Sequence, residues 1–223
     1  MKKKAFAALL LVIMALSFCS AFAESQPQIG DTLKSLADGH LRHPFEQGYT
    51  GFCIAWPSPD ACADEEYIVV SPENLYNTSN KHVADFYNYL KVYATQFSDH
   101  FLNTADYSYD VQHLIWHFSN DFTGWRVDPD LVNDITVTAA TMTIPDHYVQ
   151  QLDGMTRTWD FIILANKEIT SSTDRPLFFA YKYTDKSTVP ETGDSASPVL
   201  WGLLLAVSAI GVAVVSRKTK KAY

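Results

Sequence analysis

The hydrophobic positions fall into strand-like runs near both ends of the chain, with helical periodicity between them. Residues 48–56 place Cys53 among apolar neighbours, and residues 67–70 form a second short apolar run; both predict strands. Residues 158–164 and 177–183 are rich in aromatic and β-branched side chains, which is typical of strands in an antiparallel sheet.

Between these strands, apolar side chains recur at three- and four-residue steps. This spacing predicts an amphipathic helix from about residue 81 to about residue 101, and a second helix over residues 109–118. Asp128 followed by Pro129 predicts the capped start of a third helix that continues to about residue 140.

Residues 24–47 are interpreted as a lead-in, with a short helix predicted over residues 31–37. The Asn77-Thr78-Ser79 sequence is interpreted as a surface turn. The order strand, helices, strands over residues 48–184 predicts an α+β fold: one domain, an antiparallel β sheet or barrel with an inserted α-helical part. Residues 185–193 are interpreted as a linker that includes a sorting motif.

The first 23 residues have the composition of a secretory signal peptide. Three lysines precede an apolar run over residues 5–16, and Ala21-Phe22-Ala23 supplies a small-residue cleavage pattern. We therefore expect cleavage before Glu24 and export of the mature chain.

Residues 194–223 have the features of a transmembrane helix with a basic tail. An apolar run over residues 199–215 is followed by four basic side chains, so a permanent membrane anchor is the plainest interpretation. A pentapeptide precedes this run, and the whole arrangement resembles the LPxTG-type cell-wall sorting signal of Gram-positive bacteria. The pentapeptide is Val189, Pro190, Glu191, Thr192 and Gly193.

The resemblance implies that a sortase cleaves after Thr192 and joins this residue to peptidoglycan. The protein would then be secreted, would contact the membrane only before sorting, and would reside at the outer face of the cell wall. Three of the 17 basic residues lie in the signal peptide and four in the tail, so the mature chain keeps ten basic residues. It keeps 24 of the 25 acidic residues. A net charge of −14 for the mature chain disfavours nucleic acid as a partner.

Two short blocks carry the candidate chemistry. The first, Phe52-Cys53-Ile54, places a thiol in apolar surroundings on a predicted strand, and the second lies on the helix predicted over residues 109–118. Together they resemble the motif pair of the thioester domains of Gram-positive surface adhesins, an aromatic-Cys-aliphatic block and a Thr-Gln-x-Ala-Ile-Trp block. The matching positions of the second block are Gln112, Ile115 and Trp116, and the departures from it are Val111 and Leu114.

The resemblance implies a surface adhesin in which the Cys53 sulfur and a glutamine side chain form an internal thioester. An amine on a host surface or matrix protein would open this bond and become covalently attached. This is a single event without turnover, so the protein would not be an enzyme and would need no cofactor. Phe52, Gln112 and Trp116 are assigned to the supporting shell.

Several glutamines are candidates for the acyl donor. Gln150 lies in the sequence Val149-Gln150-Gln151-Leu152, which has the local pattern that the resemblance requires; Gln151 and Gln112 are further candidates. A different alignment puts Arg175 in the place of the glutamine. On that alignment no thioester forms, and the domain binds without a covalent bond.

Other interpretations of the same residues remain open. Cys53 and Cys62 are the only cysteines of the predicted mature chain, and a disulfide between them would leave a non-covalent binding module. Cys53 with His113 or His117 would suit a wall-anchored cysteine hydrolase. The two histidines have a metal-like spacing but lack a third ligand, and no metal site is predicted. An acidic cluster is interpreted as a solvated loop: Asp60, Asp64, Glu65 and Glu66.

Overall fold

A computed structural model describes residues 26–39, 41–56, 60–102, 108–167 and 176–188. The chain divides into two compact units, one of residues 1–150 and 158–184 and one of residues 151–157 and 185–223. The predicted signal peptide, sorting motif, membrane span and Arg175 lie outside the described residues. In the part that is described, no helix is long and apolar enough to cross a membrane.

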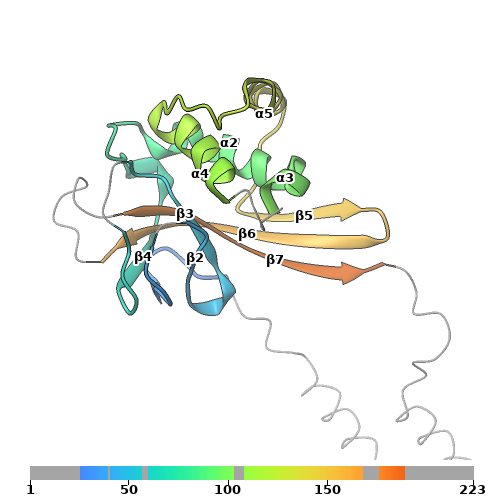
Figure 1. The fold of residues 1–223 in the computed structure, drawn as a ribbon. Coiled ribbons are helices and arrows are strands. Elements are labelled where there is room, and N and C mark those ends of the chain that lie inside the picture. The colour runs from blue at the N-terminus through green and yellow to red at the C-terminus, as the bar shows by residue number, and fades with distance from the viewer. Residues whose placement is uncertain (1–25, 40, 57–59, 103–107, 168–175, 189–223) are drawn as a thin grey trace, which may run out of the picture. The chain divides into compact units, whose positions relative to one another are not determined.

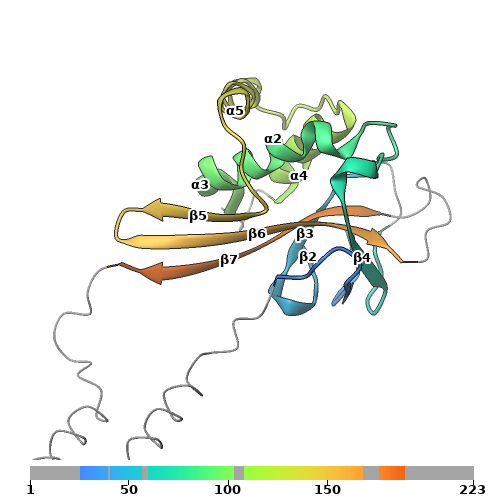
Figure 2. The same ribbon diagram turned by 180° about the vertical axis from the view of Figure 1, so that it is seen from behind.

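The architecture is a mixed α/β fold with a curled antiparallel sheet. The sheet has the strand order β1-β4-β6-β7-β3-β2, and β5 pairs with β6. Figures 1 and 2 show the helices gathered on one face of this sheet. The strands are β1 (Thr32–Lys34), β2 (His43–Pro44), β3 (Thr50–Cys53), β4 (Glu66–Val70), β5 (His147–Leu152), β6 (Met155–Asn166) and β7 (Leu177–Ser187).

The helices lie between β4 and β5 in the sequence, except for the short 3-10 helix η1 (Glu46–Gly48). Capping explains where two of them begin: the Asp128 carboxylate accepts hydrogen bonds from the first turn of α5, and the Ser71 hydroxyl accepts one from Glu73 in η2. These elements are η2 (Pro72–Asn74), α2 (Val83–Gln96), α3 (Ser98–Leu102), α4 (Ser108–Asn120) and α5 (Pro129–Thr141).

The register of β3 with β7, near the centre of the sheet, shows which side chains share a face of the sheet. Cys53 lies opposite Phe178, and Phe52 lies opposite Phe179. The Phe52 ring packs against Phe101 of α3, with 5.5 Å between ring centroids, so Phe52 faces the helices. Side chains alternate along a strand, and Cys53 therefore faces the other side, together with Gly51. A Cβ atom at Gly51 would lie only 2.7 Å from the Phe45 ring, which explains the glycine.

The lead-in differs from the prediction. Residues 31–37 contain β1 in place of a helix, because Leu33 is completely buried and the strand pairs with β4 through Leu33 and Tyr67. His43 and Phe45 are also buried, so residues 24–47 contribute to the core. Long-range pairing and burial decide the structure here, and local sequence does not report them.

Three further features differ from the prediction: two boundaries and one additional strand. The helix predicted from residue 81 to residue 101 is broken at Phe97, whose φ and ψ of −118° and 37° are not helical, so α3 is separate from α2. Strand β5 was not predicted. Strand β7 continues to Ser187, so the predicted linker starts within a strand. The strands around Cys53 and at β4, β6 and β7, and the helices α4 and α5, are confirmed.

In the second unit, the described residues form a small polar cluster. Arg157 donates two hydrogen bonds to the Asp185 carboxylate, at 2.6 and 2.8 Å, and the Thr188 N–H donates to the Gly154 carbonyl. The hydrogen bond from Arg157 lowers the pKa of Asp185. Gly154 has a φ of +71°, which suits the turn between β5 and β6.

Candidate functional site

Cys53 is the last residue of β3 and is 1% exposed. Its Sγ donates a hydrogen bond to the Ala55 carbonyl at 3.3 Å. The following residue, Ile54, donates its N–H to the Leu177 carbonyl at the start of β7. The thiol is therefore held in the core, at the point where the strand leaves the sheet.

Helix α4 supplies a hydrogen bond to the main chain of Cys53. Because Ile54 points its N–H toward β7, the main-chain groups of Cys53 point to the opposite edge of β3. The neighbour on that edge, β2, pairs with β3 only at Gly51 and Thr50 and stops short of Cys53. The Gln112 side chain fills this place: its Nε2 donates to the Cys53 carbonyl at 2.7 Å.

Gln112 is completely buried, and its Oε1 has no hydrogen-bond partner among the described residues. A buried carboxamide that satisfies a main-chain acceptor replaces a missing bond of the sheet. The structure thus brings Gln112 to the site as a residue that holds Cys53 in position.

The thiol side of β3 is aromatic with one polar edge. The ring centroids of Phe45 and Phe178 lie 5.2 Å apart, and the Tyr67 ring packs on both. The Tyr67 hydroxyl donates to the Glu65 carboxylate at 2.9 Å. Burial, chiefly, and the neighbouring Glu65 and Cys53 raise the pKa of Tyr67, so the hydroxyl stays protonated and remains a donor.

Two asparagines fix the segment that follows Cys53. Asn77 is 2% exposed, and its Nδ2 donates to the Ile54 carbonyl at 3.2 Å and to the carbonyl of Ser119 at the end of α4. Asn120 donates to the same Ile54 carbonyl at 3.2 Å and accepts from the Trp56 N–H, also at 3.2 Å. The segment is thereby tied to α4 and to the loop before α2.

Residues 78–79 form a turn and Ser79 is exposed, as predicted, but Asn77 itself is buried, which corrects the interpretation for that residue. Its Oδ1 accepts from the N–H groups of Ser79 and Lys81, so its side chain organises the turn from inside. An asparagine between polar neighbours also occurs in many exposed turns. The sequence therefore held no signal that would have identified Asn77 or Asn120 as part of the site.

Trp116 lies beside this segment. It is 4% exposed, and its ring packs against Trp56, three residues after Cys53, with 4.4 Å between centroids. Phe52 lies on the helix-facing side of β3, as described above, and therefore supports the strand from the face opposite the thiol.

Gln150 makes its contacts elsewhere. Its Nε2 donates to the Thr95 carbonyl of α2 at 2.8 Å, and its Oε1 accepts from Trp159 Nε1 at 2.9 Å. The Trp159 ring lies near the Tyr181 ring of β7. Tyr181 is three residues beyond Phe178, the strand partner of Cys53, which corresponds to about 10 Å along a strand. Gln151 is exposed and accepts from Thr156. Of the three candidate glutamines, the structure places Gln112 against Cys53.

The residues of the other interpretations have different partners. Cys53 and Cys62 are both thiols, the first buried and the second exposed, and no disulfide joins them. His113 packs against Trp116 and Phe122, and His117 Nδ1 lies 3.0 Å from the Phe122 carbonyl. Among the described residues, no three His, Cys, Asp or Glu side chains are grouped so that they could hold a metal ion.

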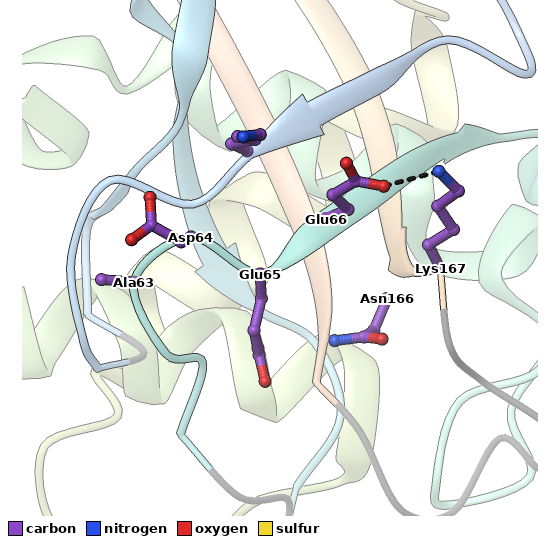
Figure 3. Close-up of a pocket in the computed structure, with 7 residues that line it drawn as sticks. Ala63, Asp64, Glu65, Glu66, Asn166 and Lys167 are labelled. Carbon is purple, nitrogen blue, oxygen red and sulfur yellow. Dashed lines mark hydrogen bonds and ion pairs between the residues drawn. The ribbon is translucent and has the colours of Figure 1, made fainter.

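A cavity of about 670 Å³ lies at the polar edge near Tyr67, and its lining does not include Cys53. Figure 3 shows Glu66 and Lys167 facing each other there as an ion pair, with Asn166 and Glu65 nearby. The hydrogen bond from Lys167 lowers the pKa of Glu66. Glu66 and Lys167 therefore neutralise each other in this cavity. Its lining is Lys34, Ala63, Asp64, Glu65, Glu66, Asn166 and Lys167.

Comparisons of this chain with protein-family models, with curated proteins and with solved structures found no match.

Proposed function

We propose that this protein is a cell-wall-anchored surface adhesin of a Gram-positive bacterium, with an attachment site centred on Cys53. One observation supports this proposal most directly: the buried thiol ends a strand whose last carbonyl is held by Gln112 of α4. The resemblance stated above pairs the same cysteine block with the same glutamine block, and the structure places these two blocks in contact.

The covalent mode proceeds in two steps. The Cys53 sulfur attacks the carboxamide carbon of Gln150 and a C–S bond forms. The C–N bond breaks, and the nitrogen takes up the thiol proton and leaves as ammonia. A ligand amine then attacks the thioester, a C–N bond forms, the C–S bond breaks, and the sulfur recovers its proton. Two side chains held together make such an acyl transfer feasible, because orientation replaces a bimolecular encounter. Gln112 positions the sulfur and is not consumed.

A second candidate is a non-covalent adhesin. The contacts of Gln150 favour it, because both ends of this carboxamide are hydrogen-bonded to Thr95 and Trp159. For the covalent mode, Gln150 must leave these partners and reach the strand end. The non-covalent mode requires no such rearrangement.

The mass of the intact protein separates the two modes. A chain with the thioester is lighter than its sequence mass by one ammonia, and methylamine then adds its own mass. Cys53→Ala and Gln150→Glu should each abolish the loss, whereas Gln151→Glu, the adjacent exposed glutamine, should retain it. A full sequence mass for the unmodified protein, unchanged by methylamine, would establish the non-covalent mode.

A further inference from the structure

An unbroken series of aromatic rings runs outward from the segment that follows Cys53. Tyr109, His113 and Trp116 are spaced by four and three residues and form one stripe along α4. Successive centroids lie 4.4 Å apart from Trp56 to Trp116, 5.7 Å from Trp116 to His113 and 6.3 Å from His113 to Tyr109. We call this series, together with Trp125, the aromatic ribbon.

The ribbon is open to solvent at both ends. Trp125 is 86% exposed, Tyr109 is 53% exposed and Trp56 is 43% exposed. Trp116, which is 4% exposed, lies between Trp56 and the other rings of the ribbon. Exposed aromatic side chains such as those at the two ends are typical of interaction sites, because they leave apolar surface in water. Tryptophan and tyrosine are also the residues that contribute most to binding energy at protein interfaces.

The protein places one cation of its own on the ribbon. The Arg126 guanidinium lies 4.4 Å from the Trp125 ring and 5.8 Å from the Tyr109 ring. Its Nη1 donates to the Asp110 carboxylate at 3.0 Å. This arrangement shows the chemistry that the ribbon accepts: a guanidinium on an aromatic face, neutralised by a carboxylate.

The charge around the ribbon has one predominant sign. From residue 108 to residue 134 the sequence holds five aspartates and a single basic residue, Arg126. Asp110 is already paired with Arg126, and Asp121 is paired with Lys81 at 2.6 Å, whereas Asp128 and Asp130 are exposed. Acidic side chains around aromatic faces complement a positively charged partner, and they steer it toward the surface.

We propose that the aromatic ribbon is the docking surface for a lysine- and arginine-bearing segment of a partner protein. Cationic side chains of the partner lie on Trp125, Tyr109 and Trp56, and the exposed Asp128 and Asp130 attract them. The inference rests on the proposed function and deepens it by naming the class of ligand that the adhesin binds. Docking itself requires no thioester.

Binding of poly-L-arginine to the full chain tests the proposal, with poly-L-glutamate of equal length as the probe of opposite charge. We expect poly-L-arginine alone to bind, and Trp125→Ala and Tyr109→Ala each to weaken the binding about three- to tenfold. These variants leave the net charge unchanged, so general electrostatic attraction would not be altered. Tyr76→Ala is the matched control: Tyr76 is 51% exposed, and its ring packs on His82, which is not part of the ribbon.

Equal binding by Trp125→Ala, Tyr109→Ala and the unmodified protein would overturn the proposal, as would an equal loss in Tyr76→Ala. Circular dichroism of the variants confirms that they are folded. Cys53→Ala separates the two proposals: it abolishes ammonia loss and should leave binding of poly-L-arginine unchanged. A protein that forms no thioester would thus still be expected to bind poly-L-arginine, and the two proposals can fail separately.

Discussion

Gln112 donates a hydrogen bond from its side-chain amide to the main-chain carbonyl of Cys53, at 2.7 Å. A side chain from a helix thereby takes the place of a strand that stops too early. The contact joins the helical part of the chain to the sheet at the residue on which the proposed function depends.

Replacement of Gln112 should destabilise the fold. Gln112→Ala leaves the Cys53 carbonyl buried without its donor, which should lower the free energy of unfolding by about 1–3 kcal/mol. Denaturant unfolding measures the change. The exposed Gln151→Ala serves as the control and should change stability by less than about 0.5 kcal/mol. Equal stability of the two variants would contradict the role assigned to Gln112.

The Asn77 side chain should matter in the same way. Asn77→Ala removes the hydrogen bonds to Ile54 and Ser119 and those from Ser79 and Lys81 in a buried site, so we expect a loss of about 2–3 kcal/mol. Asn133 lies exposed on α5, and Asn133→Ala should be nearly neutral. Thermal unfolding of both variants tests this. Unchanged stability of Asn77→Ala would show that the segment around Ile54 does not depend on the Asn77 side chain.

The two cysteines should differ in thiol reactivity. In the native protein a water-soluble thiol reagent should modify the exposed Cys62 rapidly and spare the buried Cys53. Cys62→Ser should abolish the rapid reaction. If neither cysteine reacts even after denaturation without reductant, the two form a disulfide, contrary to the structure.

Acid should destabilise the protein in part through His43. This ring is buried, its Nε2 lies 2.7 Å from Ser35 Oγ, and it stacks on Phe178. Burial lowers the pKa of His43 below its ordinary value of 6.5. The unfolded chain therefore binds the proton more readily, and stability falls as the pH drops below about 6.5 until the folded-state pKa is passed.

Comparison of His43→Gln with the unmodified protein isolates this contribution, because burial also lowers the pKa of His100 and His113. The variant should be less stable at neutral pH and should lose less stability between pH 7 and pH 5. Parallel stability curves for the two proteins over this range would refute the assignment.

The sorting motif makes a prediction about location. Thr192→Ala removes the residue that the sortase would join to peptidoglycan, so the variant should accumulate with the membrane fraction and the unmodified protein with the wall fraction. Thr188→Ala, outside the pentapeptide, is the control. Fractionation of cells that produce each variant measures the outcome. An unmodified protein found only in the membrane fraction would favour a permanent anchor.

Local signals determined much of the fold in advance. The periodicity of α4, the Asp128-Pro129 start of α5 and the apolar runs of β3, β4, β6 and β7 depend on near neighbours in the chain, and all are present. The motif blocks that contain Cys53 and Gln112 were also visible from the order of residues alone.

Contacts between distant residues decided the rest. Strand β1 exists because Leu33 is buried against β4, and Asn77 belongs to the site because Ile54 and Ser119 offer it carbonyl groups. Gln112 and Gln150 have the same side chain, and only the tertiary structure sets one against Cys53 and the other between Thr95 and Trp159. Periodicity and caps report the free energy of a local segment, whereas the partner of a buried polar group is chosen by which segments the fold brings together.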